Sequence, residues 1–211
     1  MKLTSHSFNE GQKIPGPLAF GVPDARQHVA MSRNLNPHLT WSGAPAGTRS
    51  FAIICADHDV PSKGDDVNRE GRTVPADLPR VDFFHWVLID LPQRIASIAE
   101  GEFSDRVTPR GKPGPAAAHG ARQGLNGYTE WFAGDEAMRG DYYGYDGPCP
   151  PWNDARMHRY VFTVYALDVE RLHVSARFDA LQAQAAMQAH ILDQASLTGL
   201  YSLNPDVMNR R

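Results

Sequence analysis

The sequence has no long apolar run, no block of basic residues and only two cysteines in 211 residues. No apolar stretch approaches the roughly 20 residues that a helix needs to span a bilayer, so we expect no transmembrane segment. Lysine and arginine are dispersed and the formal net charge is −3, so nothing indicates a nucleic-acid partner. What remains is a globular chain, long enough for one domain with a real core and short for two.

The N-terminal residues contain Lys2 but no apolar segment behind it, so they do not resemble a secretory signal. For a complete chain, this predicts a cytoplasmic location. Cys55 and Cys149 agree with that prediction, because small secreted domains stabilised by disulfides usually contain more cysteine. The sequence alone leaves a disulfide between the two cysteines open.

Glycine (18 residues) and proline (16 residues) divide the chain into short segments. Three segments are rich in β-branched and aromatic residues and apolar on both alternating faces, which predicts strands covered on both sides: 50–57, 82–91 and 159–167. Weaker strand candidates lie at 2–8, 39–41 and 197–203.

One helix is predicted over 178–193, a segment rich in Ala, Gln, Leu and Met, with Ser175 as its N-cap. Residues at helical spacing form a moderately apolar stripe that suits a helix lying against the outside of a sheet: Leu181, Ala185, Gln188 and Leu192.

The stretch at about 92–157 is irregular and rich in Gly, Pro and charge, and long loops of this kind are often functional. We find no internal repeat and no linker between two cores. The prediction is therefore a mostly-β chain with a single domain over residues 1–211. Its fold is a β-sandwich of antiparallel strands with a peripheral C-terminal helix, and 92–157 is a long irregular insertion.

Aromatic residues in this insertion have two readings that the sequence leaves open. They either anchor the long segment onto the sandwich or form an interface, such as that of a homodimer. These residues are Trp131, Phe132, Tyr142, Tyr143 and Tyr145.

Strand alternation places three ionisable residues in rows of apolar side chains. The rows contain Asp57 after Phe51, Ile53 and Cys55; His85 among Phe83, Val87 and Ile89; and His158 before Tyr160, Phe162 and Val164. Burying such groups without partners is costly, so we expect them to partner each other. Each residue also has an ordinary explanation, such as a core histidine, a turn-forming Asp57 or Asp59, or a solvated strand start.

Several motifs, taken in order, resemble the phosphatidylethanolamine-binding protein family, and most of all its bacterial Raf-kinase-inhibitor-like branch. The similar segments are residues 36–48, Asp57-His58-Asp59-Val60-Pro61, His85-Trp86-Val87-Leu88, Gly147-Pro148-Cys149-Pro150-Pro151 and His158-Arg159-Tyr160-Val161-Phe162. The matches run from about residue 32 to 168, and the C-terminal helix also fits.

The resemblance implies a β-sandwich with a small cavity at one end that binds phosphate-like anions, including phospholipid headgroups. It implies that the following residues line or support the cavity: Asp57, Asp59, His85, Gly147, Pro148, Pro150, Pro151, His158 and Tyr160. Two positions depart from the family pattern. His58 replaces a proline and adds an imidazole, and Asp146 stands where the family often has glycine, where its carboxylate would repel an anion unless it points away.

The favoured function is therefore non-enzymatic binding of a small phosphate-like anion or phospholipid headgroup, with a possible regulatory role and with no cofactor and no metal. A protonated histidine is a natural anion ligand near neutral pH. Two alternatives stay open: a metal-dependent or His–Asp hydrolase, and a kinase or protease inhibitor that acts by protein–protein contact, as some relatives are described. No His-Glu-x-x-His or Gly-x-Ser-x-Gly motif supports the hydrolase.

Overall fold

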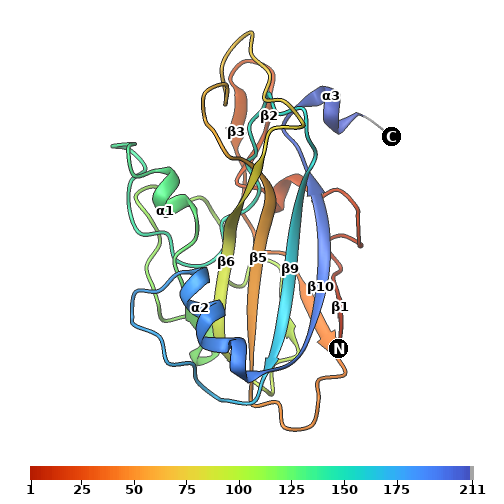
Figure 1. Ribbon diagram of the computed structural model, residues 1–211, viewed down its shortest axis with the longest axis vertical. Coiled ribbons are helices and arrows are strands. Elements are labelled where there is room, and N and C mark those ends of the chain that lie inside the picture. The colour runs from red at the N-terminus through yellow and green to blue at the C-terminus, as the bar shows by residue number, and fades with distance from the viewer. Residues whose placement is uncertain (210–211) are drawn as a thin grey trace.

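The computed structural model describes residues 1–209. Its largest sheet has five strands in the order β10-β9-β5-β6-β8, and every neighbouring pair is antiparallel. These strands are β5 (Ser50–Pro61), β6 (Arg80–Pro92), β8 (Arg122–Gln123), β9 (His158–Leu167) and β10 (Ile191–Tyr201). The three strongly predicted segments are confirmed as the strands β5, β6 and β9, which stand side by side in Figure 1.

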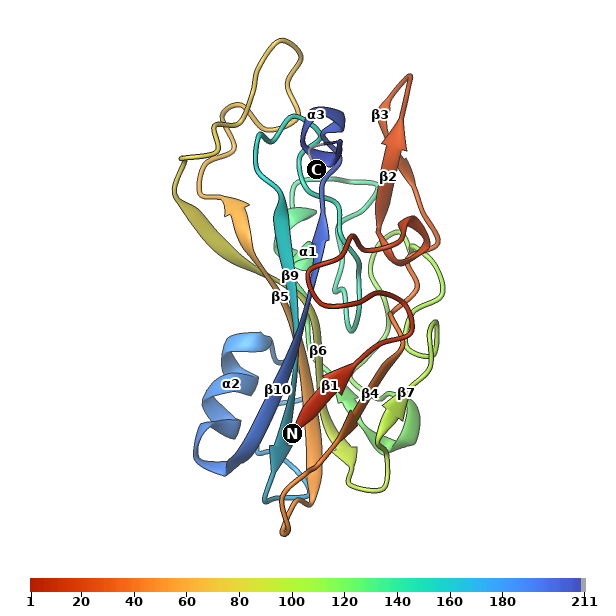
Figure 2. The ribbon, with the colours of Figure 1, turned by 90° about the vertical axis from the view of Figure 1, so that its right-hand side faces the viewer.

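A second sheet, in the order β1-β4-β7, covers one face of the large sheet. Its strands are β1 (Lys2–Thr4), β4 (Leu39–Ser42) and β7 (Ser97–Ile98). Figure 2 shows the large sheet between this small sheet and helix α2 (Ala180–Met187). One apolar core lies between the two sheets and a second lies under α2. The predicted antiparallel sandwich with a peripheral helix is confirmed.

The remaining elements are short. A hairpin of β2 (Gly21–Asp24) and β3 (His28–Met31) stands near one end of the sandwich. The short helices are η1 (Gly16–Leu18), η2 (Ala118–Gly120), α1 (Tyr128–Trp131), η3 (Gln188–His190) and α3 (Pro205–Met208). No helix within residues 1–209 has both the length and the apolar character needed to cross a membrane.

The predicted helix is present but begins later, ends earlier and buries a different face. Asp179 is the N-cap in place of Ser175, because Asp179 and Gln182 form a reciprocal capping box. The buried face consists of Ala180, Ala183 and Met187, whereas Leu181 is 65% exposed. The predicted stripe was therefore wrong, because the helix packs against the sheet through Ala180, Ala183 and Met187 rather than through Leu181.

Residues 191–193 belong to strand β10 rather than to the end of the helix. Ile191 and Asp193 pair with Leu167 and Ala166 of β9, so hydrogen bonding to the sheet outweighs the local helix propensity. The weak strand prediction at 197–203 identified only the second half of this strand.

The helices and strands that lie within the stretch 92–157 are β7, η2, β8 and α1, so most of the stretch is irregular. Its tyrosines at 142, 143 and 145 are buried, which favours the reading that they anchor the segment onto the sandwich. Trp131 alone among the five predicted aromatics is more than half exposed, at 54%. Cys55 and Cys149 are free thiols, so no disulfide joins them.

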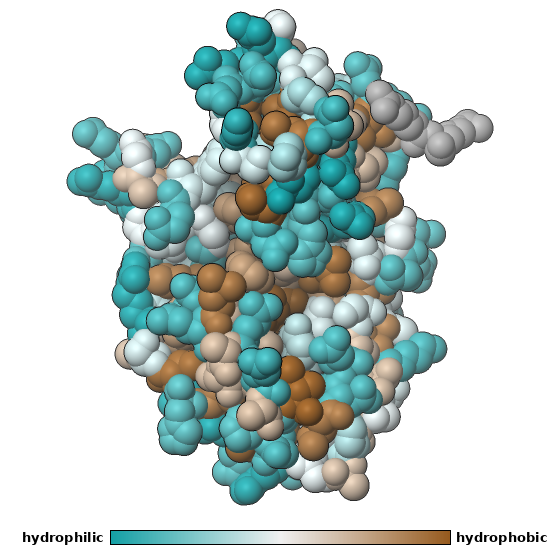
Figure 3. All heavy atoms as spheres, viewed as in Figure 1, coloured by the Kyte–Doolittle hydropathy of each residue, from teal (hydrophilic) through white to brown (hydrophobic). Residues whose placement is uncertain are grey.

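The loop 62–79 between β5 and β6 projects beyond the sheet at the top of Figure 1. Its surface is mostly hydrophilic, whereas brown patches gather lower on the same face in Figure 3. This loop lies at the end of the sheet where β5 ends and where β6 and β9 begin. The predicted site residues of these three strands therefore meet at one end of the molecule.

Candidate functional site

A pocket of about 240 Å³ lies at this end of the sheet. Its floor contains polar side chains from the three central strands, namely Asp57, His85, His158 and Tyr160. Its walls are largely apolar and come from separate segments, including Phe20, Met31, Phe83, Tyr128, Trp131 and Phe132. Residues that are distant in the sequence thus form a polar floor beneath apolar walls.

His85 reaches this floor because β6 carries a β-bulge. Cys55 pairs with Trp86 but Ala56 pairs with Phe84, so His85 is the extra residue on its strand. His85 faces the pocket, whereas Val87 belongs to the core under α2 on the opposite face. The predicted alternation that grouped His85 with Val87 was wrong, because a bulge shifts the phase by one residue.

His158 is held between two carboxylates. Nδ1 lies 2.7 Å from Asp57 and Nε2 lies 3.1 Å from Asp154, and all three side chains are buried. Burial alone would lower the pKa of His158, but the hydrogen bonds to Asp154 and Asp57 outweigh it and raise the pKa to about 9. The ring is therefore an imidazolium with both N–H groups already donated within the protein.

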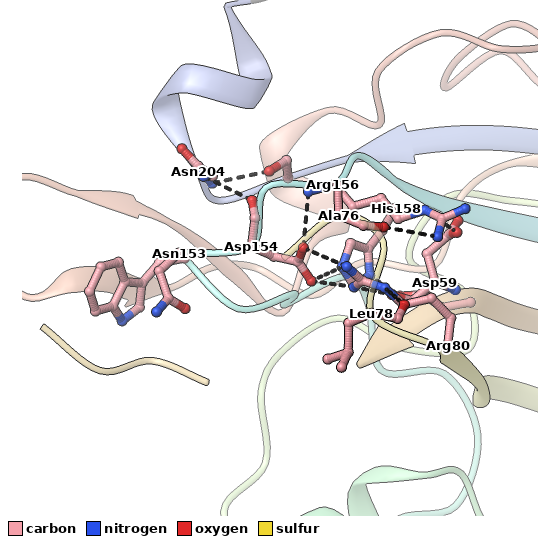
Figure 4. Close-up of polar contacts among 12 residues, drawn as sticks. Asp59, Ala76, Leu78, Arg80, Asn153, Asp154, Arg156, His158 and Asn204 are labelled. Atoms are coloured by element: carbon pink, nitrogen blue, oxygen red, sulfur yellow. Dashed lines mark hydrogen bonds and ion pairs between the residues drawn. The ribbon is translucent and has the colours of Figure 1, made fainter. Parts of the chain in front are cut away.

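Asp154 connects this histidine to Arg80, as Figure 4 shows. The carboxylate accepts from both terminal nitrogens of Arg80, whose side chain is only 6% exposed, and from the Arg156 amide. Burial would raise the pKa of Asp154, but hydrogen bonds from His158 and Arg80 hold it below its ordinary value. Charges thus alternate along the row Asp57, His158, Asp154 and Arg80.

Asp59 lies beside the pocket rather than in its lining. Its carboxylate binds Arg156 at 2.9 Å and the Arg159 guanidinium at 2.8 and 3.0 Å. Burial would raise its pKa, but the Arg159 contacts lower it below the ordinary value. His58 points away from the floor and pairs with Asp82 at 2.7 Å on the surface, so the pocket gains no third imidazole.

His85 has a different environment from His158. Its Nδ1–H donates to the backbone carbonyl of Asp146 at 2.8 Å, which leaves Nε2 for the pocket that the ring lines. Burial lowers the pKa of His85, and the nearby charges of Asp57 and Asp146 only partly oppose this. The neutral ring therefore offers a nitrogen lone pair to the pocket.

The Asp146 side chain does point away from the pocket, so it does not repel a ligand there. It is fully buried and accepts hydrogen bonds from Asn34 and Asn126, both at 2.7 Å, and pairs with Lys112 at 3.1 Å. Asn34 also accepts from the Gly147 amide, so this cluster fixes the start of the 147–151 loop.

Within that loop, Cys149, Pro150 and Pro151 line the pocket, whereas Gly147 and Pro148 support it from behind. A side chain at Gly147 would stand 2.1 Å from the Leu18 carbonyl oxygen, so only glycine fits this approach. The Pro148 carbonyl accepts from the amides of Phe20 and Gly21, which ties the loop to one wall.

Tyr160 completes the floor. The residue is 1% exposed, and its hydroxyl has no hydrogen-bond partner within residues 1–209. Burial, and then the negative charge of Asp57, raise the pKa of Tyr160 well above its ordinary value. The floor therefore contains a buried O–H donor that lies near the Asp57 carboxylate but makes no well-formed hydrogen bond within residues 1–209.

Sequence reasoning missed several residues of the site. Asp154 contacts the predicted His158, and Asn34 contacts the predicted Gly147. Arg80 is bound to Asp154, and Asn126 and Lys112 are bound to Asp146. The one available signal was Asp154, four residues before His158, but spacing in a loop fixes no contact. Within residues 1–209, no three or more His, Cys, Asp or Glu side chains are placed to hold a metal ion.

Known proteins resemble this chain in both sequence and fold. The family described as phosphatidylethanolamine-binding protein matches residues 4–202. The UPF0098 protein YbhB of Escherichia coli K12 is 28% identical over 207 residues, which cover 96% of this chain and all of YbhB. A UPF0098 protein of Chlamydia muridarum is 31% identical over 201 residues, covering 95% of this chain and 98% of the relative.

Two solved structures resemble this one. Escherichia coli YbcL, reported as a member of the mammalian PEBP family, superposes with a TM-score of 0.66 at 24% identity, covering 95% of this chain and 97% of YbcL. CT736 of Chlamydia trachomatis gives a TM-score of 0.64 at 27% identity, covering 95% and 96%. The family match over nearly the whole chain, supported by these relatives, shows that the protein belongs to the phosphatidylethanolamine-binding protein family.

Proposed function

We propose that the pocket binds a small phosphate-like oxyanion, either free or as the headgroup of an amphipathic molecule, without catalysing a reaction. The observation that carries the proposal is the buried hydroxyl of Tyr160, a pocket-lining residue, which makes no well-formed hydrogen bond in the described part of the chain, residues 1–209. A buried donor of this kind costs about 1–3 kcal/mol unless a ligand or water accepts from it.

His85 is the second group that meets the ligand. A proton on Nε2 turns it into a charged donor, so oxyanion binding is coupled to proton uptake by this ring. Since burial lowers the pKa of His85, the affinity for an anion of fixed charge rises as the pH falls toward that lowered pKa. Lys63 at the rim adds a positive charge near the mouth.

The apolar walls favour a ligand with a polar head and an apolar remainder. The volume of about 240 Å³ is at the small end for ligand sites, so the head and only part of the remainder are enclosed. His158 supports binding rather than catalysis, because both of its nitrogens are committed to carboxylates and cannot accept a substrate proton.

Calorimetric titration with inorganic phosphate at about pH 6 tests this function. Tyr160→Phe removes the unpartnered hydroxyl and keeps the ring, so we expect phosphate affinity to fall about 10- to 100-fold, as for loss of a hydrogen bond to a charged group. Tyr165→Phe is the matched control. Tyr165 lies on the same strand but packs against the core under α2, so its removal leaves affinity unchanged.

The absence of phosphate binding by the wild-type protein at millimolar concentration would contradict the proposal. Equal loss of affinity in both tyrosine variants would assign the effect to general destabilisation of β9 rather than to the pocket floor.

A further inference from the structure

Two projections stand at the pocket end of the molecule, the hairpin of β2 and β3 and the loop 62–79, as Figure 2 shows. Both border the pocket. The hairpin contributes Met31, and the loop contributes Ser62, Lys63, Gly64, Val67 and Asn68. Within residues 1–209, no backbone hydrogen bond joins the hairpin to the loop. Side-chain contacts therefore hold the two projections together.

His28, the first residue of β3, makes such contacts from the tip of the hairpin. Its ring stacks on the indole of Trp152, with 3.8 Å between the ring centroids and 10° between the ring planes. Its Nε2–H donates to Glu70 of the loop at 2.6 Å. Trp152 directly follows Pro151, which lines the pocket. One imidazole thus contacts both the loop and the segment that continues the pocket wall.

The groups that receive His28 are fixed to each other. The side chain of Asn68 accepts from the Trp152 amide at 3.1 Å. The side chain of Asn153, a residue only 5% exposed, donates to the loop carbonyls of residues 66, 69 and 72 at 2.8, 3.3 and 3.0 Å. The loop and residues 152–153 therefore form one unit, against which the hairpin tip is held.

The hairpin itself is anchored by hydrogen bonds at its base. The Gly21 amide donates to the Pro148 carbonyl at 3.2 Å, and the Tyr201 hydroxyl donates to the Gly21 carbonyl at 2.9 Å. A swing about this base would separate His28 from the loop and move Met31, which is 61% exposed at the mouth of the pocket.

The backbone of His28 lies in the left-handed region, with φ at 64°. Asp24 fixes the turn before it by accepting from the amides of Arg26 and Gln27, both at 2.8 Å. Glycine suits a left-handed position at the end of a three-residue hairpin loop best, because it has no Cβ. Histidine is less favourable there, and its contacts with Trp152 and Glu70 offset that cost.

We propose that His28, Trp152 and Glu70 form a latch that holds the hairpin tip over the pocket mouth, so that its opening sets how fast a ligand enters and leaves. The inference rests on the proposed oxyanion-binding function and adds a control of ligand exchange to it. None of the three latch residues lines the pocket. The latch therefore acts on the rates of binding rather than on the affinity.

His28→Gly tests the latch, because glycine removes the ring and suits the left-handed backbone, so the hairpin keeps its fold. NMR line-shape analysis with phenyl phosphate at about pH 6 gives the association and dissociation rate constants. We expect both to rise roughly threefold to thirtyfold, the scale of one aromatic stack with one exposed ion pair. The dissociation constant should change by less than about twofold, because the pocket lining is intact.

His119→Gly is the matched control. His119 has the same left-handed backbone, with φ at 61°, and pairs with Glu102 at 2.5 Å, but it does not line the pocket or contact the latch. This variant should leave both rate constants unchanged. Glu70→Ala removes a side chain that is 81% exposed and should raise both rate constants less than His28→Gly does. Added to His28→Gly, it should cause little further change, since the two residues share one contact.

A second measurement needs no ligand. Fluorine-19 NMR of protein containing 5-fluorotryptophan, with the Trp152 signal assigned from Trp152→Phe, should show that signal shifted in His28→Gly and unmoved in His119→Gly. Unchanged exchange rates of phenyl phosphate in His28→Gly overturn the latch, and so does a loss of affinity through the dissociation rate alone. Absence of phenyl phosphate binding to the wild-type protein overturns the proposed function and the control of exchange with it. An unmoved Trp152 signal overturns the contact at the hairpin tip.

Discussion

The two histidines of the pocket differ in what their ring nitrogens can do. His158 lies between Asp57 and Asp154 and carries a fixed positive charge. His85 donates its Nδ1–H to the Asp146 carbonyl, which leaves Nε2 for the pocket that the ring lines. The sequence analysis placed both histidines among the residues that line or support one cavity, and the structure gives their rings different environments. In the proposed function, His158 neutralises the charge around it and His85 contacts the ligand.

Asp154→Asn tests the fixed charge of His158. The folded pKa of about 9 lies above the ordinary value of 6.5, so the pairing stabilises the fold in full below about pH 6.5 and is lost as the pH rises through 9. The size of this contribution is roughly 3 kcal/mol. We expect the variant to lose roughly 3–5 kcal/mol at about pH 6, because Arg80 also loses its buried partner.

Urea unfolding at about pH 6 and about pH 9.5 measures both effects. The wild-type protein should lose stability between these pH values, and the variant should lose less. Asp168→Asn is the control, because its pair with His190 is exposed and should change stability by no more than about 0.5 kcal/mol. Parallel pH profiles for the wild type and Asp154→Asn would contradict the assignment.

At the scale of elements, alternation along β5 and β9 predicted correctly which side chains face the site. It failed on β6, where the bulge at His85 turns two successive residues, His85 and Trp86, toward the same side. No local sequence signal marks the bulge, because it arises from pairing with β5. The prediction of the buried face of helix α2 was wrong for a similar reason, because contacts with the sheet decide which face of the helix is buried.

Met187→Ala and Leu181→Ala distinguish the observed face of α2 from the face that the sequence suggested. Met187 is 1% exposed within the core under the helix, so its truncation should cost about 2–5 kcal/mol in chemical unfolding. Leu181 is largely exposed, and its truncation should change stability by no more than about 0.5 kcal/mol. A larger cost for Leu181→Ala would mean that α2 is rotated about its axis.

At the scale of the whole molecule, the central strands and the sandwich could be predicted, because runs of apolar β-branched and aromatic residues are local signals. The pocket floor could be predicted in part. Asp57, His85, His158 and Tyr160 do meet in one pocket, whereas Asp59 turns toward Arg156 and Arg159. Contacts such as His158 with Asp154 depend on how an irregular loop returns to the sheet, which no periodicity encodes.

The same limit applies to the long segment 92–157. Its composition predicts an irregular segment. It does not predict that Asp146 is buried against Asn34, Asn126 and Lys112, contacts that hold the 147–151 loop in place. One of these contacts, between Asn34 and Asp146, joins residues 112 positions apart. They follow only from the assembled fold.

Nitrogen-15 NMR of the histidine side chains tests the central claim most directly. Without ligand, we expect His158 to show two protonated ring nitrogens up to about pH 9 and His85 to be neutral at pH 7, with its proton on Nδ1. Addition of millimolar phosphate at about pH 6 should shift His85 Nε2 and leave the protonation of His158 unchanged. A neutral, titrating His158, or a His85 ring that does not respond to phosphate, would contradict the account.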